Sequence, residues 1–307
     1  MNVIKFLNEI KEPKVSELGG KGYSLAVLMN NGFNVPKGFV VTSEAFFKFL
    51  EENNLKKKIN KLASEINVNN FQEKSKKIRN LILKGKIPEE IISEIKDALE
   101  KLDVGYVSIR SSAVSEDSLK ASFAGLHDTF LNVKTEIEPI LENMKKCWAS
   151  LFNDRAVIYR IKKKIPHLEG MAVIIQEMIS SEMSGITFTK HPIDEKSLLI
   201  EASYGLGDMI VGGKVDPDDY VIDRKTLEIK EEKIGEKRKM SIVTNENTDI
   251  VDTDPAMTKN QVLGNNRIKE LAEICLKIEK IFDYPQDIEW CIYDGKIWLL
   301  QSRAITG

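Results

Sequence analysis

The chain has 307 residues, of which 42% are hydrophobic and 30% are charged. This composition is typical of a globular protein and excludes a disordered, collagen-like or coiled-coil chain. The 45 Lys and Arg residues nearly balance the 47 Asp and Glu residues, and the net charge is −2. We therefore expect neither nucleic acid nor a membrane as a partner, because the chain has no general positive field.

The cysteines and the apolar runs indicate a cytoplasmic protein. The three cysteines form no C-x-x-C pair and lie far apart, which argues against a disulfide framework and a zinc site. The first residues lack the basic and apolar regions of a signal peptide. Apolar runs such as 171–175 are too short to cross a bilayer.

The first half of the chain has a mainly helical pattern. Apolar residues recur there at helical spacing, and short β-prone runs separate the helical stretches. In chain order we expect a helix that follows Gly22 and ends at Gly32, a strand at 39–41, several helices over 43–102, a strand at 104–109 that ends before Arg110, a strand at 128–133 and a helix at 137–151.

The second half is richer in strands. Short β-prone runs separated by turn residues begin at Met171. One long helix is predicted to start at the capping box 258–261, and the chain ends in strands at 287–292 and 296–303. We therefore predict an α+β protein with a helix-rich lobe, 1–170, and a strand-rich lobe, 171–307.

Three segments of the first lobe have residues suited to phosphate binding. Lys21 lies among three glycines just before a helix, where the backbone can approach an anion closely. Arg110 precedes two serines and has a guanidinium that can grip phosphate oxygens. Gly125 and Thr129 offer a flexible loop and a hydroxyl. Glycines before helices are common, however, and Arg110 could instead pair with the nearby Glu116 or Asp117.

The last hairpin allows two registers. A two-residue turn at Asp294-Gly295 would place Glu289 and Gln301 on opposite faces. A three-residue turn at 293–295, with Gly295 left-handed, separates polar from apolar residues more cleanly, and we favour it. The polar face then holds Asp287, Glu289, Gln301 and Arg303.

This second register predicts a metal and phosphate site. Glu289 and Gln301 supply two oxygens to a hard cation such as Mg²⁺, and Arg303 supplies positive charge for a phosphate. The alternative is a polar hairpin face in contact with solvent. Farther upstream, 177–179 follows a buried strand and could offer backbone groups to an adenine edge.

Several segments together resemble the ATP-binding domain of the family of pyruvate phosphate dikinase, phosphoenolpyruvate synthase and rifampicin phosphotransferase. The resemblance runs in order from Lys14 to Thr306, and it implies an ATP-grasp fold with nucleotide and magnesium between two α+β lobes. The segments are KVSELGGKGYSLAVL, VPKGFVVT, SIRSSAVSEDSLKASFAGLHDTFLNV, SGITFTKHP, EASYGLGD and PQDIEWCIYDGKIWLLQSRAIT.

The resemblance implies a role for each candidate residue. By the family pattern, Lys21 and Arg110 bind phosphates, Glu289 and Gln301 bind the metal, Arg303 lies near the transferred group, Glu177, Met178 and Ile179 form the adenine hinge, and Gly125 with Thr129 covers the phosphates. In this family ATP yields AMP and phosphate while the β-phosphoryl group moves to a histidine on a separate swivelling domain. No phosphohistidine motif is visible in this chain, so we expect that domain in trans or beyond the given sequence.

Two other functions remain open from the residues. An ATP-grasp carboxylate ligase would make ADP and need a carboxylate pocket, for which the sequence has no signal. A non-catalytic ATP-binding sensor or scaffold would bind ATP without transfer. The missing histidine motif and the departures from the family pattern favour this second alternative; the departures are at Leu126, His127, Asp208 and Ala304.

Overall fold

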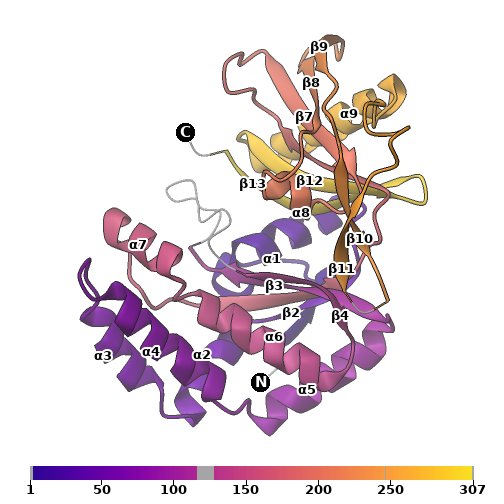
Figure 1. The fold of residues 1–307 in the computed structure, drawn as a ribbon. Coiled ribbons are helices and arrows are strands. Elements are labelled where there is room, and N and C mark those ends of the chain that lie inside the picture. The colour runs from indigo at the N-terminus through magenta and orange to yellow at the C-terminus, as the bar shows by residue number, and fades with distance from the viewer. Residues whose placement is uncertain (1–2, 116–127, 246, 306–307) are drawn as a thin grey trace. The chain divides into compact units, whose positions relative to one another are not determined.

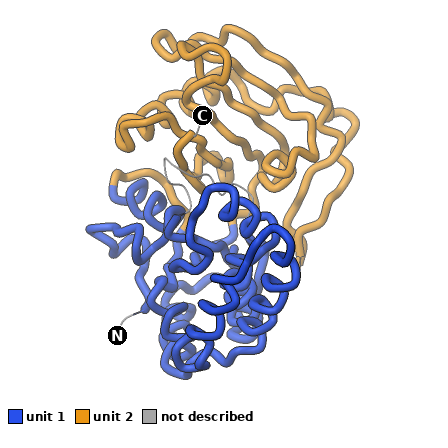
Figure 2. The backbone as a smooth tube through the Cα atoms, turned by 90° about the vertical axis from the view of Figure 1, so that its left-hand side faces the viewer, with its two compact units in different colours: residues 1–30, 37–178 blue, residues 31–36, 179–307 orange. Residues whose placement is uncertain are grey.

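The computed structural model describes residues 3–115, 128–245 and 247–305. The chain divides into two compact units (Figure 2). Unit 1 comprises residues 1–30 and 37–178, and unit 2 comprises residues 31–36 and 179–307. In the described part of the chain, no helix combines the length and the apolar character needed to span a bilayer.

Unit 1 is a five-stranded antiparallel sheet with helices on both faces (Figure 1). The strands, in their spatial order, are β1 (Ile4–Phe6), β2 (Gly38–Val41), β5 (Met171–Glu177), β3 (Tyr106–Ala113) and β4 (Thr129–Lys134). The helices are η1 (Leu7–Glu9), α1 (Val15–Asn30), α2 (Ser43–Glu52), α3 (Lys56–Ser64), α4 (Phe71–Lys84), α5 (Glu89–Leu102), α6 (Ile137–Ser150) and α7 (Asp154–Lys163).

The main core of unit 1 lies on one face of this sheet. Ile109 and Ile175 point to that face, where they join Phe46, Phe49 and Trp148 from α2 and α6 in one apolar cluster. Apolar residues at helical spacing therefore did predict the buried face of α6. The other face packs against α1, since the backbone of α1 bonds to the side chain of a β3 residue that points away from the main core.

Unit 2 is a six-stranded antiparallel sheet with the long helix α9 on one face. In spatial order its strands are β13 (Lys296–Ala304), β12 (Gln286–Tyr293), β6 (Met183–Phe188), β7 (Ser197–Tyr204), β8 (Asp218–Asp223) and β9 (Ile229–Lys233). The short helix α8 (Asp208–Val211), the separate hairpin β10 (Lys239–Val243) and β11 (Thr248–Asp252), and α9 (Asn265–Phe282) complete it. The side chains of Cys275 in α9 and Thr187 form a hydrogen bond, and Thr187 Oγ1 accepts one from the indole N–H of Trp290.

Three element predictions need correction. The glycine-rich segment 19–22, expected to precede the first helix, lies within α1, which Gly19 interrupts. The strand predicted to end at residue 109 continues to Ala113, so Arg110 lies inside β3 and not at its exit. The long helix begins at Asn265 and not at the capping box 258–261, because Thr258 donates its hydroxyl to Pro255 O instead of capping a helix.

The division into units differs from the expected boundary after residue 170. Strand β5 pairs with both β2 and β3, and it therefore belongs to the sheet of unit 1. The first unit consequently extends to Met178.

Candidate functional site

The glycine-rich turn at the start of the chain packs directly against β3. Gly19 interrupts α1 with φ 69° and ψ 176°, a conformation open almost only to glycine. A Cβ atom at Gly19 would lie 2.1 Å from the carbonyl oxygen of Ser112, far inside van der Waals contact. The missing side chain therefore lets the turn approach the strand that carries Arg110.

Hydrogen bonds hold Lys21 at this point. Its side chain is almost fully buried, and Nζ donates to the carbonyl oxygen of Ser111 at 3.0 Å. The backbone N–H of Gly22 donates to Ser112 Oγ at 3.1 Å, and that hydroxyl donates to Leu18 O at 2.8 Å. Two segments about 90 residues apart in the chain, each a separate phosphate candidate in the sequence, therefore meet in unit 1.

Arg110 lies in the interior of β3, between β5 and the edge strand β4. It is paired in register with Thr129 of β4 and with Ile174 of β5, so Arg110 and Thr129 point to the same face. Arg110 is 8% exposed, and the guanidinium is thus held in a largely desolvated environment. The structure brings Lys21, Arg110 and Thr129 together on and beside β3. Gly125, the remaining residue of the predicted phosphate loop, lies outside the described residues.

The predicted adenine hinge coincides with the boundary between the units. Glu177 ends β5, and its N–H donates to Lys37 O at 2.8 Å. The N–H of Met178 donates to Tyr106 O at 3.1 Å. Met178 is the last residue of unit 1 and Ile179 the first of the long stretch of unit 2, so this segment connects the two units in the chain.

The turn of the last hairpin has two residues, and the predicted three-residue turn is wrong. Tyr293 pairs with Lys296, and Asp294 and Gly295 both have positive φ, at 49° and 66°. These angles correspond to a type I′ turn, whose twist matches that of the flanking strands and for which Asp-Gly is a preferred pair. Local turn chemistry therefore outweighed the cleaner separation of polar and apolar residues.

A β-bulge farther along the hairpin nevertheless brings the polar pair together. Trp290 pairs with Leu299 but Glu289 pairs with Gln301, so Leu300 is the extra residue. Glu289 and Gln301 therefore face each other on the same side of the sheet, as expected, but through a bulge instead of a longer turn. Trp298 lies opposite Cys291, on the same side of the sheet as Glu289.

Asp287 holds Arg303 in a fixed orientation. The two residues are paired in register, and Arg303 donates from Nε and Nη2 to Asp287 Oδ2 at 2.8 and 2.6 Å. Burial raises the pKa of the Asp287 carboxyl above its ordinary value, although Arg303 opposes this effect. Its other oxygen, Oδ1, is buried and has no hydrogen-bond partner among the described residues. The sequence placed Asp287 on this face but indicated no role for it.

Two further carboxylates, Glu201 and Asp219, lie on the same face of the sheet as Asp287 and Glu289; these four residues are called the acidic row. Glu289 of β12 pairs with Ile186 of β6, Ile186 pairs with Glu201 of β7, and Glu201 pairs with Asp219 of β8. Residues paired in this way point to the same side, so all four share the face opposite α9. Burial, reinforced by the carboxylates of Asp219 and Asp287, raises the pKa of Glu201. Burial also raises the pKa of Asp219. No sequence signal singled out these two residues, because only strand pairing places them beside Glu289.

The donor set on this face fits magnesium. Glu289 offers a carboxylate and the buried Gln301 an amide oxygen, both of which are hard ligands, and the unpartnered Oδ1 of Asp287 lies two register positions away on the same face. Among the described residues, no group of three or more His, Cys, Asp or Glu side chains could hold a metal by itself. This sparse set suits Mg²⁺, which commonly binds one or two carboxylates together with substrate phosphates.

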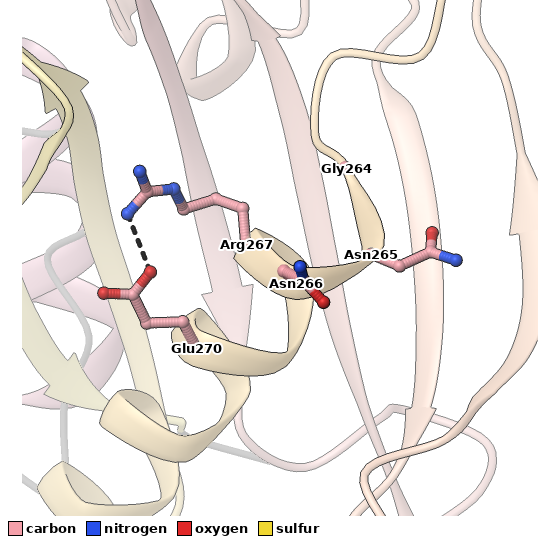
Figure 3. A pocket seen from close by; sticks show the side chains of 5 residues that line it. All are labelled: Gly264, Asn265, Asn266, Arg267 and Glu270. Atoms are coloured by element: carbon pink, nitrogen blue, oxygen red, sulfur yellow. Dashed lines mark hydrogen bonds and ion pairs between the residues drawn. The ribbon is translucent and has the colours of Figure 1, made fainter.

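A separate cavity lies at the N-terminus of α9 (Figure 3). Arg267 and Glu270 form an ion pair of 2.7 Å along one side of it. Its described lining residues differ from every predicted site residue, so it is not the site described above. The lining consists of Gly264, Asn265, Asn266, Arg267 and Glu270.

Comparison with known proteins identifies relatives along the whole chain. A probable phosphoenolpyruvate synthase of Methanocaldococcus jannaschii is 40% identical over 100% of this chain and 27% of the relative. The corresponding protein of Archaeoglobus fulgidus is 41% identical over 99% of this chain and 41% of the relative. An uncharacterized phosphotransferase of Bacillus subtilis is 38% identical over 94% of this chain and 33% of the relative. The chain thus spans less than half the length of these relatives.

Structural similarity and sequence similarity to known proteins give different information about this chain. A crystal structure of a Pyrococcus horikoshii protein aligns with 70% of this chain and 80% of that chain, but at 14% identity and a TM-score of 0.36. That similarity is too low to identify a fold. The family model "Pyruvate phosphate dikinase, AMP/ATP-binding domain" matches residues 15–307. The predicted resemblance is therefore confirmed, and the chain belongs to the family of pyruvate phosphate dikinase AMP/ATP-binding domains.

Proposed function

We propose that this chain binds Mg-ATP in an ATP-grasp fold and carries out the nucleotide half-reaction of a dikinase-type phosphotransferase. ATP and water are consumed, AMP and phosphate leave, and the β-phosphoryl group ends on a histidine nitrogen of a separate swivelling domain. The relatives' names support a phosphotransferase, and their greater length leaves room for further domains.

The observation that carries this proposal is the meeting of Lys21 with the Arg110 strand in unit 1. The turn with Lys21 and the strand with Arg110 and Thr129 are joined by hydrogen bonds at Ser111 and Ser112. A buried lysine that bonds to the residue following a buried arginine supplies two cationic side chains at one strand, which suits a polyanion such as a triphosphate. We assign phosphate binding to these three residues, and adenine contact to the backbone of residues 177–179.

The residues of unit 2 supply the metal ligands and a positioned cation. We assign Mg²⁺ to Glu289 and Gln301; when bound, it neutralises phosphate charge and orients the phosphate oxygens. The Asp287 carboxylate fixes the guanidinium of Arg303, which stabilises negative charge that develops on the transferred phosphoryl group.

The chain acts on the phosphates by positioning and charge neutralisation, without a nucleophile of its own. The attacking nitrogen belongs to the histidine of the swivelling domain and displaces AMP from the β-phosphorus. Water then takes the γ-phosphoryl group, which leaves as phosphate. Lys21 and Arg110 lower the cost of bringing the nucleophile to an anionic substrate.

The test combines the chain with Mg-ATP labelled at the β-phosphate and a purified phosphohistidine domain of this family. We expect AMP in the nucleotide fraction and an acid-labile label on the histidine domain, and a Lys21→Met variant should lose most of both. Formation of ADP would indicate a ligase or ordinary kinase instead. ATP binding without any labelled histidine, with several such domains, would leave a sensor as the function.

A further inference from the structure

Lys21, Arg110 and Thr129 together are called the phosphate cluster. A buried ion pair between Arg160 and Glu169 lies elsewhere in unit 1. Arg160 of α7 is fully buried, and its side-chain exposure is 0%. Nη1 donates to Leu151 O at 2.6 Å, and Nη2 donates to Glu169 Oε1 at 2.7 Å. A guanidinium removed from water is costly unless it is paired, so the Glu169 carboxylate is what makes its burial possible.

Glu169 in turn binds the chain just after β3. Its Oε2 accepts the backbone N–H of Ser115, and its Oε1 accepts the Ser115 hydroxyl, both at 2.7 Å. The preceding residue, Val114, donates its N–H to Gly170 O. The hydrogen bonding between β3 and β5 thus continues beyond their last regular pair, Ala113 with Met171. The side chain of Glu169 makes the last of these bonds, to Ser115.

The anchored strand end is continuous with the phosphate cluster. The hydroxyl of Ser112, three residues before Ser115, accepts a hydrogen bond from the N–H of Gly22. The carbonyl oxygen of Ser111 accepts one from the ammonium group of Lys21. A shift of the strand end would therefore move both the carbonyl that holds Lys21 and the hydroxyl that holds Gly22. Among the described residues, Arg160 bonds to Leu151 O and to Glu169, and Glu169 bonds to Ser115, so this strand links the pair to the cluster.

We propose that Arg160 and Glu169 are positioning residues for the phosphate-binding cluster, and that they act by fixing the end of β3 through Ser115. This inference rests on the proposed binding of ATP by Lys21 and Arg110. The competing interpretation is that the pair only ties α7 to the sheet and contributes to stability alone.

A neighbouring ion pair is a matched control. Arg79 of α4 donates to Asp154 at the start of α7 at 2.8 Å, and also to Phe152 O. This pair anchors the N-terminal end of the same helix but makes none of its described bonds to β3 or to residue 115. Its loss should lower stability without changing the phosphate cluster.

The experiment measures the dissociation constants for Mg-ATP and for adenosine, which has no phosphate, by calorimetry. The proteins are the wild type, Glu169→Gln, Ser115→Ala, Arg160→Lys and Arg160→Met, with Asp154→Asn as control. Mutations along a coupled network change binding by roughly two- to thirtyfold. We expect a loss in that range for Mg-ATP in Glu169→Gln, with adenosine binding unchanged, and a smaller loss in Arg160→Lys than in Arg160→Met.

The outcomes separate the two interpretations. Selective loss of Mg-ATP binding in Glu169→Gln and Ser115→Ala, with none in Asp154→Asn, supports the proposal. Unchanged Mg-ATP binding, or an equal loss for ATP and adenosine, overturns it. If Glu169→Gln does not fold, Ser115→Ala decides, since it removes one surface-proximal hydroxyl. A wild type that binds no ATP overturns the proposed function itself, and with it this inference.

Discussion

Replacing Gly19 by alanine tests whether the contact between the glycine turn and β3 builds the phosphate cluster. The added methyl group would lie 2.1 Å from the carbonyl oxygen of Ser112, a backbone atom that cannot rotate away, and 2.3 Å from the hydroxyl oxygen of the same residue. The turn must therefore retreat by roughly 1 Å, because a packed interior has no free space for the methyl group. That retreat stretches the bonds from Lys21 and Gly22 to β3, which measure 3.0 and 3.1 Å.

The expected cost has two parts. A non-glycine residue at φ 69° and ψ 176° costs about 1 to 3 kcal/mol. The loss of two hydrogen bonds adds about 0.5 to 1.5 kcal/mol each. Gly19→Ala should thus lower the free energy of unfolding by about 2 to 6 kcal/mol. Mg-ATP binding should be lost in the variant molecules that remain folded.

Alanine substitutions at two other glycines separate the cost of backbone strain from the cost of the steric clash with β3. Gly32 has φ 79° and Gly105 an ordinary φ, and no described atom lies within 4 Å of a Cβ added at either. Gly32→Ala should therefore show only backbone strain, about 1 to 2 kcal/mol, and Gly105→Ala almost no change. Urea unfolding followed by circular dichroism gives the stabilities, and calorimetry gives the ATP affinities. A Gly19→Ala protein that is as stable as Gly105→Ala and binds ATP normally would refute the reasoning.

Three further changes test unit 2. Glu289→Gln keeps the size of the side chain but removes its charge, so affinity for ATP should fall at least about tenfold with Mg²⁺ and little without it, as measured by calorimetry; equal losses would contradict the metal assignment. Glu201→Gln should raise stability at neutral pH, because the raised pKa of Glu201 means that burial disfavours its charged form in the folded protein. The stability contributed by the protonated Glu201 is lost as the pH rises through its folded pKa, so the gain should shrink toward a pH of about 4; a gain independent of pH would exclude this cause. Lys237→Met leaves the fully buried Asp218 without its ion-pair partner and should cost about 3 to 5 kcal/mol in urea unfolding, part of which Asp218→Asn should restore in the double variant; an unchanged midpoint would show that the pair contributes nothing.

The helices of unit 1 and the family were accessible from the sequence. Helical periodicity predicted the buried faces of α5 and α6, because side chains three and four residues apart meet on one face whatever the rest of the fold does. The motifs around Lys21, Arg110 and the last hairpin were long enough to indicate the family, which the family comparison confirmed. These signals depend on residues close together in the chain.

Pairing between distant strands was not accessible in the same way. The assignment of β5 to unit 1 depends on hydrogen bonds to β2 and β3, which no local pattern encodes. A two-residue turn alone would place Glu289 and Gln301 on opposite faces of the hairpin. The bulge at Leu300 shifts the register by one residue, so the two residues share a face although the turn was predicted wrongly.

The sequence by itself determined the composition class, most of the helical faces, the family and the residue types that suit a nucleotide and a metal. Only the tertiary structure decided that Lys21 rests on the strand of Arg110, that Asp287 holds Arg303, and that Glu201 and Asp219 continue the acidic row. The physical reason is that strand register and close backbone contact come from hydrogen bonds and packing between residues far apart in the chain, whereas periodicity and turn chemistry come from neighbours.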